Sequence, residues 1–272
     1  VFMAVYDCGS VNVRQLKKAI DQTFGEDDII NLLFVSHFHS DHVNKIEYLK
    51  KRCQVKNIVI PVLTSGLVLE SLVHDFIQSN GSGWNRNALQ FLSNCINASY
   101  NNDGGDIRIF SIDVSGEGSE ERQIIDLDSD DLIGPSVLHD TEIRFCDWIY
   151  VPYYIGDKYD ELIAEFEANG FVFNLDLRRT DFLKEICEEI RKIGVDILKR
   201  IYGKVYRNNH NSYSMPVYSG LKRHINALLC AQGENMETCT VRPIVCTPEI
   251  SMPGLRRIST TLRLIIHVIG TE

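Results

Sequence analysis

The stretch Ser36-His37-Phe38-His39-Ser40-Asp41-His42 places four side chains of metal-ligand type within six residues. It continues the apolar run 29–36, which predicts a buried strand, and it leads into a predicted helix. Because side chains alternate along a strand, we expect the first two histidines to point the same way while the last two ligands turn toward the helix. We therefore predict that His37, His39, Asp41 and His42 are metal ligands.

Imidazole and carboxylate groups suit Zn, Mn or Fe ions. Two adjacent ions can hold a hydroxide as the nucleophile and can polarise the bond that it attacks. The motif therefore predicts a metal-dependent hydrolase in which Asp41 is a catalytic residue as well as a ligand. The alternative is that these histidines cap a helix or lie on the surface. Three of the eight histidines of the chain share this window, which favours the metal site.

Apolar patterns on both sides of the motif predict an α/β fold. A strand is expected over residues 2–7, a helix with Leu16 and Ile20 on its buried face follows, and helices over 43–52 and 66–79 flank a strand over 55–60. Short strands are expected over 107–113, 122–127, 136–146 and 148–154, and helices over 157–207. The spacing of Phe182, Ile186, Ile190, Ile193, Ile197 and Ile201 predicts a continuous core face. We expect one domain over 1–272, with a helical insertion at 157–207 and an atypical tail at 236–272.

Composition and charge narrow the class of protein. The chain has 272 residues, 44% of them apolar, which predicts a packed core. Its net charge of −9 disfavours nucleic acid as a partner without excluding it. No apolar run approaches the length of a membrane span, and the first residues, from Val1, lack a basic leader and look trimmed. We expect a cytoplasmic protein that does not enter a membrane, with mostly buried thiols among its eight cysteines.

The histidine motif, together with Asp7-Cys8-Gly9-Ser10, resembles the two leading motifs of the metallo-β-lactamase-fold hydrolases. This resemblance implies an αββα sandwich, incomplete here at the C-terminus. It also implies two zinc ions, with Mn or Fe as alternatives, the first held by His37 and His39 and the second by Asp41 and His42. Asp7 would support the loop from behind the ligands. The alternative role for Asp7 is that of an ordinary turn residue.

A second segment, Asn208-Asn209-His210-Asn211-Ser212, is similar to the metallo-β-lactamase domain of competence-type DNA-uptake proteins, as is the strand 143–153 before it. That similarity implies a phosphodiesterase or nuclease, with a phosphodiester or other small-molecule substrate. Nucleic acid remains a possible partner, although the basic clusters 17–18, 50–52, 178–179 and 222–223 are typical of solvated helix faces. Hydrolysis of a lactam, thioester or lactone is the alternative activity. A degenerate metal-binding or interaction module without turnover is the alternative of another class, and the oligomeric state stays open.

The later ligands of the family are not evident in this sequence. The family has a third motif with a further metal-binding histidine. His139 follows a short predicted strand and is either a candidate for that ligand or a structural residue. We expect His74 to pack on a helix and His210 to lie in a turn. His224 falls in a basic helical stretch and His267 in an apolar run.

The tail departs from the family after the predicted strand at 212–218. Relatives carry a Thr-Gly-Asp turn there, whereas this chain has Cys246-Thr247-Pro248-Glu249-Ile250-Ser251-Met252-Pro253-Gly254. Codons for this segment, re-read from the third base, permit Tyr-Thr-Gly-Asp-Ile-Asp-Ala. One hypothesis is that a frameshift after about Leu229 removed the bridging Asp and weakened metal binding. The other is a native divergent tail, and the coding DNA decides between them.

Overall fold

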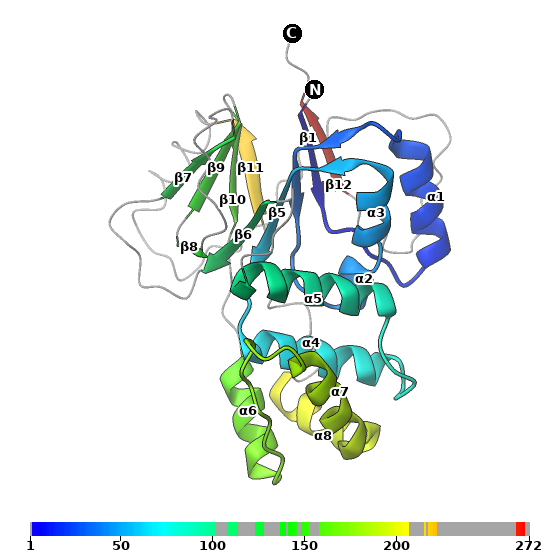
Figure 1. Ribbon diagram of the computed structural model, residues 1–272, viewed down its shortest axis with the longest axis vertical. Coiled ribbons are helices and arrows are strands. Elements are labelled where there is room, and N and C mark those ends of the chain that lie inside the picture. The colour runs from blue at the N-terminus through cyan, green and yellow to red at the C-terminus, as the bar shows by residue number, and fades with distance from the viewer. Residues whose placement is uncertain are drawn as a thin grey trace.

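A central six-stranded sheet organises the chain (Figure 1). The computed structural model describes residues 2–101, 108–113, 123–127, 137–139, 141–145, 148–152, 158–206, 215, 217–221 and 265–269. The strand order is β12-β1-β3-β5-β6-β8, and every pair is parallel except β12 with β1. The strands are β1 (Phe2–Tyr6), β3 (Leu32–Phe34), β5 (Asn57–Pro61), β6 (Arg108–Asp113), β8 (Val137–His139) and β12 (Ile265–Ile269). The carboxyl ends of five strands therefore share one edge.

A four-stranded sheet packs against one face of the central sheet. Its order is β11 (Val217–Leu221), β10 (Trp148–Pro152), β9 (Thr141–Phe145) and β7 (Gln123–Asp126). Apolar side chains from both sheets form one buried cluster, in which the rings of Phe2 and Phe145 stack with their centroids 4.0 Å apart. Alternation along the strands explains this, because Phe34 points to the second sheet while Leu33 points to the helices.

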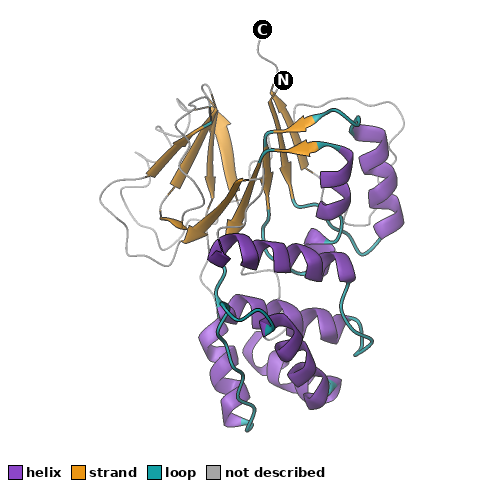
Figure 2. Ribbon diagram, in the orientation of Figure 1, coloured by secondary structure: helices purple, strands orange, loops and turns teal. Residues whose placement is uncertain are grey.

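Helices cover the other face of the central sheet (Figure 2). Those beside this face are α1 (Val13–Thr23) and α3 (Ile46–Arg52), whereas α2 (Ser40–Val43), α5 (Arg86–Asn101) and α4 (Ser65–Gln78) lie at and beyond the carboxyl edge of the strands (Figure 1). Leu16 and Ile20 of α1 are fully buried, as their spacing predicts. The described residues thus form helix, sheet and sheet layers, which confirms the mixed α/β class. A fourth, helical layer outside the second sheet is not among the described residues.

The predicted helical segment is present as α6 (Tyr159–Ala168), α7 (Phe182–Ile193) and α8 (Val195–Tyr206). These helices pack around α4 and extend the same apolar core. The close contact between α4 and α6 needs a glycine at position 66, because a Cβ there would lie 2.5 Å from the side chain of Tyr159. The predicted core face is confirmed, because five of its six residues are buried and the partly buried Ile197 packs against the same core. It is carried by two helices, because Gly194, with φ +83°, ends α7.

Three further predicted elements are each split in two. The strand expected over 136–146 forms β8 of the central sheet and β9 of the second sheet. The strand expected over 29–36 divides into β2 (Ile29–Ile30) and β3, because the side chain of Asn31 accepts a hydrogen bond from the backbone of Met3. The strand β2 pairs instead with β4 (Gln54–Val55) in a separate small sheet. The helix expected over 43–52 is the pair α2 and α3.

Part of the predicted organisation lies outside the described residues. This applies to Asn208–Ser212 and to the proposed frame change between Leu229 and Gly254, whereas β12 within the tail is described. No helix within the described ranges is long and apolar enough to cross a membrane.

Candidate metal centre

Asp7 is the hub of the site, at the carboxyl end of β1. Its backbone has φ +56°, a left-handed conformation that Asp and Asn tolerate better than most residues. The fully buried carboxylate accepts hydrogen bonds from the backbone N and from Oγ of Ser36, both at 2.7 Å, and from Nδ1 of His42 at 2.7 Å. Asp7 therefore joins the end of β3 to α2, which agrees with the supporting role that the sequence suggested.

Gly9 brings the loop after β1 against the backbone of α2. A Cβ at this position would lie 2.3 Å from the carbonyl carbon of His42 and 2.5 Å from the nitrogen of Val43. Cys8 donates its N–H to the carbonyl oxygen of His42, and Lys45 donates to the carbonyl oxygen of Cys8, both at 2.9 Å. A residue without a side chain is needed for this approach.

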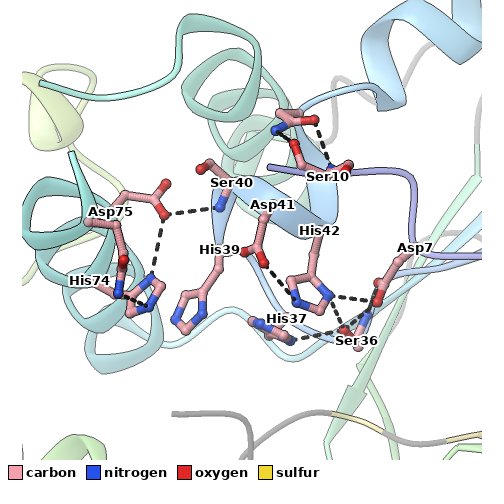
Figure 3. Close-up of polar contacts among 12 residues, drawn as sticks. Asp7, Ser10, Ser36, His37, His39, Ser40, Asp41, His42, His74 and Asp75 are labelled. Atoms are coloured by element: carbon pink, nitrogen blue, oxygen red, sulfur yellow. Dashed lines mark hydrogen bonds and ion pairs between the residues drawn. The ribbon is translucent and has the colours of Figure 1, made fainter. Parts of the chain in front are cut away.

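The three histidines of the motif are buried side by side (Figure 3). The ring centroid of His37 lies 3.7 Å from that of His42 and 4.4 Å from that of His39. Their exposed fractions are 5% for His37, 2% for His39 and 1% for His42, so the alternative of a surface position is wrong for these three side chains. Segments distant in the sequence cover this loop, because Asp7 and Cys8 after β1 and Asp75 of α4 are hydrogen-bonded to it.

A ring nitrogen of each of these histidines lies within hydrogen-bond distance of a side-chain oxygen. Nδ1 of His37 lies 2.9 Å from Oγ of Ser36, which already donates its proton to Asp7, so the imidazole is the donor in this contact. Nδ1 of His42 donates to Asp7, because an ionised carboxylate only accepts. Nε2 of His39 lies 3.0 Å from both carboxylate oxygens of Glu70.

This hydrogen bonding selects a tautomer for each neutral ring. The lone pair lies on Nε2 of His37 and His42 and on Nδ1 of His39. Metal-ligating histidines are typically anchored in this way, with the non-ligating nitrogen bound to a carboxylate or another acceptor. Together with the carboxylate of Asp41, the chemistry of this donor set fits a divalent first-row metal.

Asp41 lies in the first turn of α2, and its side chain is 39% exposed. Its Oδ2 is 3.8 Å from Nε2 of His42, so these two predicted ligands of one ion lie next to each other. Within the described ranges, however, no group of three or more His, Cys, Asp and Glu side chains is arranged around a single ion position.

Four residues on α4 and α8 join this cluster although the sequence analysis did not place them there. His74 stacks on His39 with ring centroids 3.6 Å apart and an interplanar angle of 13°. Asp75 accepts a hydrogen bond from the backbone N of Ser40 at 3.0 Å. The other two, Glu70 and Tyr202, are buried. His74 therefore packs on a helix, as expected, but against the metal motif.

One sequence signal points to this part of the site. Glu70 and His74 are polar residues four apart in an otherwise largely apolar helix, so they lie on the same face. Tyr202 gives no such signal, because it has the spacing of an ordinary core residue of α8.

The ion pair between His39 and Glu70 sets the charges in the buried cluster. Burial alone would lower the pKa of His39, but the Glu70 carboxylate outweighs it and the pKa of His39 lies above its ordinary value. Burial likewise pushes the pKa of Glu70 up, and His39 together with the Tyr202 hydroxyl outweighs it, so the pKa of Glu70 lies below its ordinary value. A metal that binds His39 must displace a proton from this pair.

The remaining histidine candidates lie elsewhere. His139 ends β8 at the carboxyl edge, but β8 is three strands from β3, a separation of about 14 Å at the usual strand spacing. His267 stands opposite Ala4 within the edge strand β12, away from that carboxyl edge. His210 and His224 lie outside the described residues.

The described basic clusters are engaged by neighbouring acids. Lys17 pairs with Asp21 at 3.2 Å, Lys50 with Glu47 at 3.0 Å, and Arg179 with Glu185 at 2.6 Å. These local pairs agree with solvated helix faces. The cluster at 222–223 lies outside the described part of the chain.

Comparison of the chain with protein-family models, with curated proteins and with solved structures found no match.

Proposed function

We propose that this chain is a metal-dependent hydrolase of the metallo-β-lactamase type, with an αββα sandwich built on the layers described above. The observation that carries the proposal is the set of three adjacent buried histidines, each with a ring nitrogen bound to Ser36, Glu70 or Asp7, as is typical of metal-ligating histidines. Such anchoring is costly to build into a core and is what a metal centre requires.

In this proposal His37 and His39 hold one ion, and Asp41 and His42 hold a second. When bound, divalent ions supply a Lewis acid and an activated water. Zinc is the first choice for three imidazoles and a carboxylate, with Mn or Fe as alternatives.

The protein's own residues orient the reacting groups. Asp7 keeps the proton of His42 on Nδ1, and Ser36 does the same for His37. In this proposal Asp41 is also the catalytic residue, because a carboxylate can accept a proton from the attacking water, and its partial exposure supports that role.

The proposed substrate is a phosphodiester, and it rests on the similarity at Asn208–Ser212, outside the described residues. We also propose that the protein is cytoplasmic. Four described cysteines are buried free thiols, as is usual in reducing compartments: Cys8, Cys53, Cys95 and Cys187.

A hydrolysis panel tests the proposal. Metal-stripped protein reloaded with Zn²⁺ or Mn²⁺ is offered bis(4-nitrophenyl) phosphate, single-stranded DNA and RNA, and in parallel a lactam, a thioester and a lactone. We expect metal-dependent cleavage of a phosphodiester that is lost in His37→Ala. Cleavage confined to the second set would replace the substrate class. Metal binding without turnover of any compound would favour the interaction module and contradict the enzyme.

A further inference from the structure

Tyr202 of the helical segment 158–206 is connected to the metal motif through Glu70. The hydroxyl of Tyr202 on α8 donates a hydrogen bond of 2.5 Å to Oε1 of Glu70 on α4. Both carboxylate oxygens of Glu70 lie 3.0 Å from Nε2 of His39. Hydrogen bonds thus connect Tyr202 of α8 through Glu70 to the predicted metal ligand His39.

Glu70 is an expensive residue to place here. Its side chain is buried within an apolar helix, and a buried carboxylate is stabilised only when partners satisfy its oxygens. The partners of Glu70 are His39, Tyr202 and a weaker contact with Oγ of Ser71 at 3.4 Å. An apolar side chain would fill this position at lower cost, so the contact with His39 needs a reason.

We propose that Glu70 and Tyr202 are positioning residues for His39, so that the helical segment 158–206 forms part of the outer support of the metal centre. This inference rests on the proposed function. Glu70 holds the proton of a neutral His39 on Nε2 and thereby presents Nδ1 to the metal, and Tyr202 fixes the carboxylate that does so.

The orientation of the His39 ring is set by the same helix. His74, one turn after Glu70 on α4, stacks on the ring at 3.6 Å, and His37 meets its edge at 4.4 Å and 88°. In Figure 3 the ring of His39 lies between those of His74 and His37. The helix α4 thus fixes both the plane and the tautomer of this ligand.

Four variants test the inference: Glu70→Met, which removes the acceptor at similar volume; Glu70→Gln, which keeps one acceptor oxygen; Tyr202→Phe; and the control Tyr100→Phe. The hydroxyl of Tyr100 also donates a hydrogen bond, to the carbonyl oxygen of Leu63 at 3.0 Å. This bond lies outside the buried histidine cluster. Affinity for Co²⁺ is measured by absorption titration. The tautomer of His39 is read by ¹⁵N NMR in metal-free protein at a pH where the ring is neutral.

We expect Glu70→Met to weaken Co²⁺ binding about 100-fold and Glu70→Gln about 10-fold, the range found for lost outer partners of metal-ligating histidines. Tyr202→Phe loses one hydrogen bond to the carboxylate and should weaken binding about 3- to 10-fold, while Tyr100→Phe binds as the unaltered protein does. In the NMR measurement, the unaltered protein carries the proton on Nε2, and Glu70→Met shows a mixture of tautomers.

The outcomes separate this inference from the proposed function. Unchanged Co²⁺ affinity and an unchanged His39 tautomer in Glu70→Met would overturn the inference, even where His37→Ala abolishes binding and so supports the metal centre. Absence of Co²⁺ binding in the unaltered protein would overturn the proposed function, whereas a tautomer change in Glu70→Met would still support the positioning role. If Glu70→Met does not fold, Tyr202→Phe decides: equal effects of the two Tyr→Phe variants would overturn the inference.

Discussion

Replacement of Gly9 by alanine tests how the site is tied to the fold. The added Cβ would lie 2.3 Å from the carbonyl carbon of His42, whereas carbon atoms in contact prefer about 3.5–4.0 Å. The obstructing atoms belong to the backbone of α2, so no side-chain rotation relieves the clash. The loop and the helix must separate by about 1 Å or more.

That movement sets the size of the effect. Overpacking of a core costs about 1–3 kcal/mol. The separation also strains the two backbone hydrogen bonds of 2.9 Å that join Cys8 to His42 and Lys45, each with a net contribution of about 0.5–1.5 kcal/mol. We therefore expect Gly9→Ala to lower the free energy of unfolding by about 2–6 kcal/mol.

Equilibrium unfolding in guanidinium chloride measures this loss as a shift of the midpoint at constant slope. The matched control is Gly203→Ala in α8, where a Cβ would meet no atom within 4 Å. Alanine is the better helix former, so the control should gain up to about 1 kcal/mol. A Gly9→Ala midpoint equal to that of the unaltered protein would refute the close approach of the loop and the helix.

Three other changes probe the buried cluster and the core. Asp7→Asn keeps the shape of the side chain and tolerates the φ of +56°, but its amide group replaces the Oδ2 acceptor for Ser36 and His42. We expect the free energy of unfolding to fall by about 2–4 kcal/mol in the same assay. A fall below about 1 kcal/mol would contradict the hub role. His39→Ala leaves the buried Glu70 carboxylate without its imidazole and should cost about 3–5 kcal/mol in metal-free protein; adding Glu70→Met should recover part of this, and strictly additive losses would argue against the pair. Burial raises the pKa of Cys53 to about 11 and that of Cys187 to about 12. Iodoacetamide at pH 8 should therefore modify neither thiol in the folded protein and both in guanidinium chloride, as measured by peptide mapping. Rapid labelling of the folded protein would contradict their burial.

Much of the layer order could be predicted because its signals are local. The apolar run of β5 and the helical spacing of Leu16 and Ile20 are properties of short segments, and the structure confirms both elements. The break at Asn31 was missed because one side-chain hydrogen bond to Met3 outweighs an apolar pattern. The break between α7 and α8 was signalled by Gly194, a residue often found just after a helix.

The site, like the fold, could be predicted from the sequence only where its residues are close together in the chain. His37, His39, Asp41 and His42 could be proposed together because they are contiguous, and the structure brings their segment into one cluster. Glu70 lies 31 residues from His39 and Tyr202 lies 132 residues from Glu70, so their contacts depend on how the helices pack and not on local pattern. The burial of the three histidines has the same origin, since distant segments cover them.

Metal content at equilibrium tests the central claim most directly. Purified chain, stripped with a chelator and dialysed against Zn²⁺, is analysed by atomic emission beside His37→Ala, with circular dichroism to verify that both are folded. We predict bound zinc in the unaltered chain, with two ions for a complete hydrolase centre, and loss of that zinc in folded His37→Ala. Absence of zinc from the unaltered chain, or a full complement in His37→Ala, would contradict the assignment of Ser36–His42 as a metal centre.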